Sequence, residues 1–220
     1  MKYRHHWISG DRIDLPAGKV VCVGRNYMAH IRELNNPLPD DPVLFIKPST
    51  ALTSLEHPIS LPRNRGAVHH EAEVALLIKS ALVNASEQEV MDAIIAVGLG
   101  LDLTLRDLQG QQKAKGLPWE VAKSFDNSSP LTGFVAKEHF DSLGELEFSL
   151  DVNKQLRQSG TTAHMLTSIP GLLSYISRHF TLLPGDVVLT GTPEGVGPLE
   201  PGDELNVSLK DSFSVKTRCV

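Results

Sequence analysis

The segment spanning residues 69–78 is the feature that most limits how this chain can fold. It reads H-H-E-A-E-V-A-L-L-I, so two glutamates stand at the start of a run apolar enough to be buried. In an extended chain, side chains two residues apart point to the same face, which would place Glu71 and Glu73 side by side, roughly 6–7 Å apart at the backbone. Paired carboxylates repel each other and resist leaving water, and a bound cation would relieve both costs. The alternative for an isolated E-x-E is an exposed strand end with two solvated acids.

A third acid follows the next apolar strand. Residues 94–102 read I-I-A-V-G-L-G-L-D, which predicts a buried strand with Asp102 at its end. A short helix over 86–93 is predicted between the two strands from its capping-box spacing. Consecutive strands commonly neighbour each other in one sheet, so Asp102 is expected to approach Glu71 and Glu73. Three carboxylates without a histidine or cysteine partner favour a hard cation, Mg²⁺ or Mn²⁺.

The remaining pattern predicts an α+β fold with many short strands and few helices. Further strands are expected at residues 19–24, 43–47, 133–136, 146–152 and 187–190. Further helices are expected at residues 25–34, 104–116 and 168–179, with Thr104 as the cap of the second. Residues 52–68 are rich in proline and turn residues and are expected to cross the surface as a loop. No regular alternation of strand and helix is present, which favours α+β over a parallel α/β sheet.

Composition narrows the function classes. The 220 residues are 41% hydrophobic, enough for one substantial core. The net charge of −5, with no basic run, argues against a nucleic-acid partner. No apolar stretch approaches the ~18 residues of a membrane span, so no membrane contact is expected. The two cysteines lie far apart without metal-type spacing, which favours the reducing cytoplasm.

Several other side chains are candidates for chemistry. Lys123, flanked by apolar residues in V-A-K-S-F, could stabilise an oxyanion or enolate, and the alternative is an ordinary surface lysine. The same two possibilities hold for Lys47, which stands at the end of an expected strand. His30 and Glu33 are three apart and share a helix face, where a carboxylate can raise the basicity of an imidazole. Their place between a strand and a proline-rich loop is typical of a mobile flap, although such pairs are often ordinary surface contacts.

The glycine-rich stretch G-T-P-E-G-V-G-P at 191–198 is not a Walker-type nucleotide loop, because no Lys-Ser/Thr follows it. Its backbone N–H groups and the Thr192 hydroxyl could still hold a small carboxylate. The alternative is a plain glycine-rich connection.

Six ordered segments resemble the fumarylacetoacetate hydrolase family, and the resemblance runs from about residue 19 to the C-terminus. They read V-G-R-N-Y-x-x-H-x-x-E, F-I-K-P, H-x-E-A-E, D-L-T-L-R-D-L-Q, K-S-F-D and L-x-G-D-V-V-L-T-G-T-P-E-G-V-G. The likeness is greatest to the small single-domain members, the acylpyruvase and oxaloacetate-processing branch.

The resemblance implies a mixed β-roll in a homodimer, with residues 1–18 as a short N-terminal lead-in and residues 19–220 as one catalytic domain. It implies that Mg²⁺ or Mn²⁺ is held by the three acids, that His30 and Glu33 are an acid–base pair on a lid, and that Lys123 polarises the substrate oxygen. The residues implied to orient the substrate are Arg25, Lys47, Arg106, Gln109 and Thr192.

A metal beside Lys123 would suit a small 2-oxo acid that reacts through a metal-stabilised enolate. The expected activity is enol–keto tautomerisation of oxaloacetate, with decarboxylation as a possible side activity, because the short chain leaves little room for a large substrate. The alternatives are hydrolysis of an acylpyruvate, an isomerase or hydratase of aromatic degradation, and a metal-carboxylate binding protein without catalysis.

Overall fold

The central sheet is built around the two apolar strands that carry the acids. The computed structural model describes residues 3–220. Strand β5 (Ala72–Ile78) is buried along its whole length and pairs antiparallel with β6 (Ile94–Leu101), so the two strands neighbour each other as predicted. Helix α2 (Glu87–Ala93) connects them and begins with the predicted capping box, in which the Ser86 hydroxyl and the Glu89 carboxylate bond each other's backbone N–H. The local sequence therefore determines this unit.

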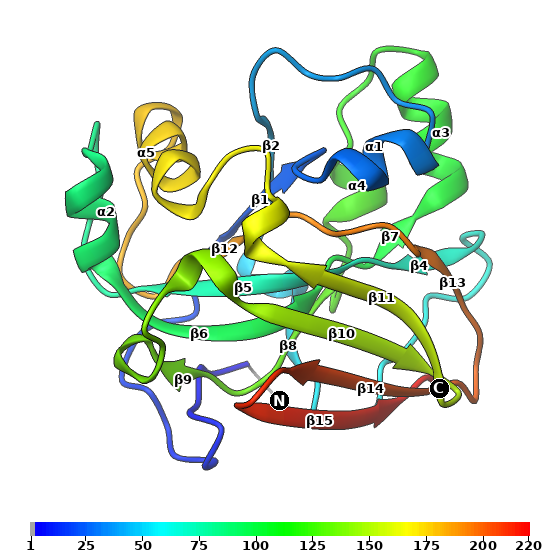
Figure 1. Ribbon diagram of the computed structural model, residues 1–220. Coiled ribbons are helices and arrows are strands. Elements are labelled where there is room, and N and C mark those ends of the chain that lie inside the picture. The colour runs from blue at the N-terminus through cyan, green and yellow to red at the C-terminus, as the bar shows by residue number, and fades with distance from the viewer. Residues whose placement is uncertain (1–2) are drawn as a thin grey trace.

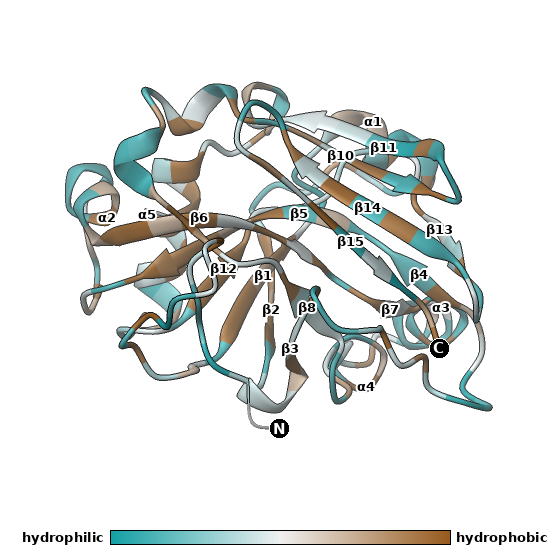
Figure 2. Cartoon of the chain, turned by 90° about the horizontal axis from the view of Figure 1, so that it is seen from below, coloured by the Kyte–Doolittle hydropathy of each residue, from teal (hydrophilic) through white to brown (hydrophobic). Residues whose placement is uncertain are grey.

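Six further strands complete the central sheet. Its order is β2-β1-β12-β5-β6-β8-β3, and β9 pairs with β6 on the same edge as β8, nearer the start of β6. The added strands are β1 (Val20–Gly24), β2 (Val43–Lys47), β3 (Leu52–Ser54), β8 (Ser129–Leu131), β9 (Val135–Ala136) and β12 (Val187–Leu189). Figure 2 shows apolar residues concentrated along the central strands, where the sheet is covered on both sides.

A second sheet of four antiparallel strands packs against the first. Its order is β11-β10-β14-β15, with bounds β10 (Glu147–Val152), β11 (Gln155–Thr161), β14 (Glu204–Leu209) and β15 (Phe213–Arg218). Buried side chains of the two sheets, such as Leu76, Leu99, Leu150 and Val207, belong to one hydrophobic core. Figure 1 shows the second sheet lying across β5 and β6, which gives the layered β-roll expected from the family resemblance.

A small third sheet continues the central strands at the end where the acids lie. Strands β4 (Val68–His70), β7 (Thr104–Leu105) and β13 (Gly197–Leu199) form it in the order β13-β4-β7. Glu71 occupies the break between β4 and β5, and Asp102 lies in the matching break between β6 and β7. The chain therefore leaves the central sheet at both points, and the backbone N–H of Asp102 donates to the Glu71 carbonyl over 2.8 Å.

The helices gather at two ends of the central sheet (Figure 1). Helices α1 (Met28–Glu33), α3 (Arg106–Ala114) and α4 (Glu120–Lys123) lie at the end with the acids, and α2 and α5 (Ile169–His179) contact each other at the opposite end. Short 3-10 helices occur at Ser49–Ala51, Lys137–His139, Leu143–Glu145 and Thr162–His164. None of the helices in the described part of the chain combines the length and hydropathy that a membrane crossing requires.

Three details of the predicted elements are wrong. Residues 52–68 are not only loop, because β3 pairs there with β8 and Val68 begins β4. Thr104 does not cap a helix; it lies in β7, and α3 begins at Arg106 without a side-chain cap. The strand expected at 133–136 is shorter, covering only Val135–Ala136. The local pattern misleads at Thr104 because its backbone pairs with His69 of β4, a contact distant in the sequence.

The expected strands also omit several of the observed ones. Strand β11 has a mostly exposed, polar sequence, and β8 contains a proline, so neither carries the usual strand pattern. Strand β14, E-L-N-V-S-L, does alternate between apolar and polar residues, and this signal was present in the sequence. Residues 6–12 form a small turn that is closed by an isolated antiparallel β-bridge between His6 and Arg12.

A candidate metal and 2-oxo acid site

The three acids meet in the interior of the molecule. Ligand oxygens of Glu71, Glu73 and Asp102 all lie within 4.8 Å of one another. The residues are 5%, 1% and 1% exposed, so the solvated strand end that the E-x-E pattern allowed is wrong. The two breaks in the central strands bring Glu71 and Asp102 together, while Glu73 points to the same place from the second residue of β5.

Two of the three carboxylates are neutralised by basic side chains. Lys123 Nζ donates to Glu71 Oε2 over 2.7 Å and also to Asp102 Oδ2. Lys47 Nζ lies 2.7 Å from Asp102 Oδ1, and Arg106 forms an ion pair with Glu71 Oε1. Burial raises the pKa of Glu71, but Lys123 and Arg106 outweigh this effect and hold that pKa well below its usual range.

Glu73 is the exception. Its Oε2 accepts one hydrogen bond, 2.7 Å long, from the backbone N–H of Gly191, and no basic side chain in residues 3–220 forms an ion pair with it. Burial raises the pKa of Glu73 well above its usual range, and the charges of Asp102 and Glu71 raise it further. An added divalent cation would supply the missing positive charge, and three carboxylate oxygens are the donors that Mg²⁺ and Mn²⁺ prefer. The residues present therefore fit such an ion.

The two lysines are not surface residues. Lys123 is 2% exposed and Lys47 is fully buried, so the surface alternative is wrong for both. Burial lowers the pKa of Lys123, but the charges of Asp102 and Glu71 raise it by more, so the ammonium stays charged. Lys123 Nζ also donates to Thr104 Oγ1 over 2.7 Å, and the Thr104 hydroxyl donates to the Asp102 carbonyl over 3.0 Å. Thr104 was not predicted as a site residue.

His30 and Glu33 form the expected pair on α1. The His30 Nδ1 atom lies 3.1 Å from Glu33 Oε2, and Glu33 Oε1 accepts a 2.8 Å hydrogen bond from the backbone N–H of Gly195. With Nδ1 donating to a carboxylate, the neutral imidazole keeps its free lone pair on Nε2. Glu33 therefore fixes the tautomer of His30 and also links α1 to the glycine-rich stretch at 191–198.

These side chains enclose a small pocket beside the acids. The volume of this pocket is about 30 Å³, which is room for about one or two water molecules. The residues that line it come from α1 and its neighbouring loops, α3, α4 and the central strands with their breaks, and include Arg25, His30, Glu71, Asp102, Arg106, Gln109, Lys113 and Lys123. Arg106 also donates from Nη1 to Gln109 Oε1 over 2.7 Å, so their side chains act together.

Two of the expected substrate residues, Lys47 and Thr192, do not line this pocket. Lys47 is fully buried, and its Nζ donates to the Ser128 carbonyl over 2.7 Å. Thr192 contacts the backbone of β5 instead. Its hydroxyl donates to the Ala72 carbonyl over 2.8 Å and accepts a 2.8 Å bond from Gln158 Nε2. Gln158 in turn accepts a hydrogen bond from the backbone N–H of Ala72 and contacts His70. The Thr192 hydroxyl proton is therefore committed to the backbone beside Glu71 and Glu73. Gln158 lies in the polar strand β11, and no local pattern in the sequence marked it.

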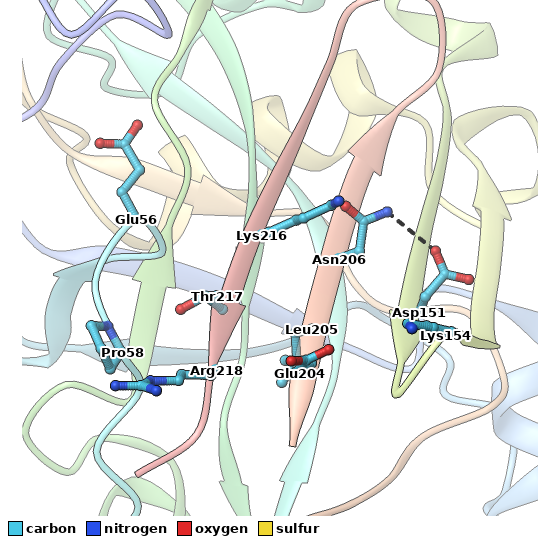
Figure 3. Close-up of a pocket in the computed structure, with 10 residues that line it drawn as sticks. All are labelled: Glu56, Pro58, Asp151, Lys154, Glu204, Leu205, Asn206, Lys216, Thr217 and Arg218. Atoms are coloured by element: carbon cyan, nitrogen blue, oxygen red, sulfur yellow. Dashed lines mark hydrogen bonds between the residues drawn. The ribbon is translucent and has the colours of Figure 1, made fainter. Parts of the chain in front are cut away.

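A larger cavity of about 640 Å³ lies elsewhere, on the second sheet. Figure 3 shows that its wall mixes acidic and basic side chains, including Glu204, Lys216 and Arg218 from β14 and β15, with Glu56 across the gap. The three charged residues from β14 and β15 are exposed, and none of the residues that converge around the acids lines this groove. The chemistry therefore lies at the small pocket.

The described geometry agrees with comparisons to known proteins. The family model for the C-terminal domain of fumarylacetoacetate hydrolase matches residues 19–220. The chain belongs to the fumarylacetoacetate hydrolase family. It is 52% identical to oxaloacetate tautomerase YcgM of Escherichia coli over 217 residues, which are 98% of this chain and 99% of that protein. As a member of this family over nearly its whole length, the chain is an enzyme.

Solved structures of the fumarylacetoacetate hydrolase family have the same fold. A family protein from Yersinia pestis is 48% identical and superimposes with a TM-score of 0.97, covering 99% of this chain and 100% of that one. A fumarylpyruvate hydrolase from Pseudomonas aeruginosa, in complex with Mn²⁺ and pyruvate, is 31% identical with a TM-score of 0.92, covering 100% and 96%. The predicted fold class is thus confirmed.

Proposed function

We propose that this enzyme interconverts the enol and keto forms of oxaloacetate and depends on Mg²⁺ or Mn²⁺. The observation that carries the proposal is the buried set of three carboxylates with Lys123 among them. Binding alone would not need a charged lysine beside the acids or a tautomer-fixed histidine on the pocket wall. The similarity to the Escherichia coli oxaloacetate tautomerase supports the choice of substrate.

In this proposal Glu71, Glu73 and Asp102 hold the divalent ion. When bound, that ion supplies positive charge to the keto oxygen and the adjacent carboxylate of a 2-oxo acid. The Pseudomonas aeruginosa relative in complex with Mn²⁺ and pyruvate supports this arrangement, since pyruvate is itself a 2-oxo acid.

The protein's own groups carry the proton transfer. Arg106 and Gln109 orient the carboxylate next to the keto group, because the Arg106 guanidinium can bond it in two places. The Lys123 ammonium, which donates to Glu71, Asp102 and Thr104, places its positive charge beside the acids and stabilises negative charge that develops on the substrate oxygen. The neutral His30 imidazole takes the proton of the enol hydroxyl at Nε2 and delivers it to the adjacent carbon, so the O–H bond that breaks is balanced by the C–H bond that forms. Glu33 stabilises the imidazolium during the exchange.

Hydrolysis of an acylpyruvate is the second candidate. The fumarylpyruvate hydrolase from Pseudomonas aeruginosa shares the fold across the whole chain, and a His30–Glu33 pair could equally activate a water molecule. The 52% identity to the Escherichia coli oxaloacetate tautomerase favours the smaller substrate. Decarboxylation of oxaloacetate fits the same enolate as a side activity, whereas an isomerase or hydratase of aromatic degradation would need more space.

The test is to follow the ultraviolet absorbance of enol-oxaloacetate and of acetylpyruvate with purified enzyme, with Mg²⁺ and with a chelator. We expect Mg²⁺-dependent loss of the enol, and about a hundredfold lower turnover in His30→Ala with unchanged Mg²⁺ binding by calorimetry. Enol loss at the buffer rate together with rapid acetylpyruvate cleavage would favour the hydrolase instead. Activity at the uncatalysed rate on both would overturn both proposed substrates.

We also propose that the enzyme is a cytoplasmic homodimer with a lead-in at 1–18 and one catalytic domain at 19–220. Both cysteines are free and buried, which suits a reducing compartment. The family match over 19–220 supports the domain boundary. Light scattering after size-exclusion chromatography measures the oligomeric state.

A further inference from the structure

Two basic residues in the small pocket have no acidic partner. Arg25, at the junction of β1 and α1, and Lys113, on α3, line the pocket and are half-buried. Neither forms an ion pair with any residue in the described chain. Arg106 and Lys123 line the same pocket but are engaged with Glu71. The pocket therefore carries unbalanced positive charge on the side formed by Arg25 and Lys113.

Lys113 is available to a ligand. Its Nζ donates to Asn36 Oδ1 over 2.6 Å, and an ammonium group has three donors, so two remain. Burial lowers the pKa of Lys113, and the guanidinium groups of Arg25 and Arg106 lower it further. Arg25 is also held at a φ of 64°, a conformation uncommon for residues other than glycine, asparagine and aspartate. An anion between the two side chains would relieve the repulsion.

We propose that Arg25 and Lys113 form a second carboxylate subsite, so that the enzyme selects 2-oxo acids with a carboxylate at both ends. This inference rests on the proposed function, which places the first carboxylate against Arg106 and Gln109. Asn36, which accepts a hydrogen bond from Lys113, lies on the loop after α1. A carboxylate bound to Lys113 is therefore linked through Asn36 to the lid. Lys113 is thus a specificity residue that the family resemblance did not supply.

The test compares two substrates that differ only in the second charge, enol-oxaloacetate and its 4-methyl ester, in three enzymes. Lys113→Met removes the proposed contact, and Lys115→Met is the matched control, since Lys115 is exposed at the end of the same helix and outside the pocket. In Lys113→Met we expect KM for oxaloacetate to rise about tenfold, with KM for the ester and kcat for both unchanged within about twofold. In Lys115→Met we expect no change.

A parallel binding measurement separates this subsite from the proposed activity. Calorimetry in Mg²⁺ compares oxalate, which reaches only the first carboxylate position, with 3,3-dimethyloxaloacetate, which has both carboxylates and cannot enolise. We expect Lys113→Met to weaken dimethyloxaloacetate about tenfold and oxalate not at all. If wild type turns over neither substrate, the proposed function fails and this measurement still decides the subsite. Equal effects on both ligands, or no effect on either, would overturn it.

Discussion

At the scale of single residues, Glu73 is the most unusual group in the molecule. Glu71 and Asp102 each contact basic side chains, whereas Glu73 has only the Gly191 N–H and two neighbouring acids. Without a divalent ion, a charge on Glu73 is therefore unfavourable and the carboxyl tends to keep its proton; with an ion, the carboxylate is a ligand. Glu73 should therefore lower the free energy of unfolding of the metal-free protein and raise that of the metal-bound protein.

This reasoning gives a pH prediction for Glu73. In the metal-free protein its pKa stands above the ordinary value of 4.5, so the folded state keeps a proton that the unfolded state releases. Stability should therefore fall as pH rises from about 4.5 towards the raised pKa. Glu71 acts oppositely: its pKa is lowered, and its contribution is lost only on acidification below the ordinary value. Glu73→Gln should have a higher Tm than wild type at pH 8 in a chelator.

Differential scanning fluorimetry between pH 5 and pH 8 measures this difference. Glu138→Gln is the control, because Glu138 is exposed on a 3-10 helix far in sequence from the acids. A Tm for Glu73→Gln below that of wild type at pH 8, with Glu138→Gln unchanged, would contradict the role given to Glu73.

At the scale of elements, α1 depends on its tertiary contacts. It has six residues, and no side chain caps its start, so it would not be stable alone. Asn26, just before it, donates to the Thr190 carbonyl over 2.9 Å, and Glu33 bonds Gly195 at its end. These contacts suit an element that opens to admit substrate, since the pocket it covers is too small for one as it stands.

We predict that backbone amides of residues 26–36 exchange with deuterium faster than those of β5, and that oxalate with Mg²⁺ slows them. Glu33→Ala should accelerate the exchange further, because it removes the bond to Gly195. Arg32→Ala, an exposed change on the same helix, is the control. Mass spectrometry of peptides from this region measures the rates. Exchange as slow as that of β5, unaffected by ligand, would argue against a lid.

At the scale of the whole molecule, the site joins distant parts of the chain. Glu71 and Asp102 come from strand breaks in the middle of the sequence, Lys47 from β2, Lys123 from α4 and the Gly191 amide from the end of β12. A cation that Glu71, Glu73 and Asp102 bind only when the fold has assembled them must stabilise the whole fold.

We therefore expect Mg²⁺ at a hundred times its Kd to raise the free energy of unfolding by about 2.7 kcal/mol over the value in a chelator. Urea denaturation at constant ionic strength, with Na⁺ replacing Mg²⁺ in the reference, measures the gain. The increase should disappear in Glu73→Gln, which lacks one ligand. An equal gain in that variant would show that Mg²⁺ acts elsewhere on the protein.

The sequence by itself determined the strands of the two apolar runs, the capped helix between them and the kinds of residue at the site. These follow from short-range pattern: the β5 and β6 runs are apolar throughout, and Ser86 and Glu89 satisfy each other's backbone. The ordered motifs also sufficed to identify the family. Only the tertiary structure decided which acid lacks a counter-charge, that Thr104 bonds Lys123, that Gln158 holds Thr192, and that Arg25 and Lys113 share one pocket. These pairs are separated by 19 to 88 residues. Contacts over such separations depend on how sheets and loops meet, because burial and charge balance are properties of the assembled fold.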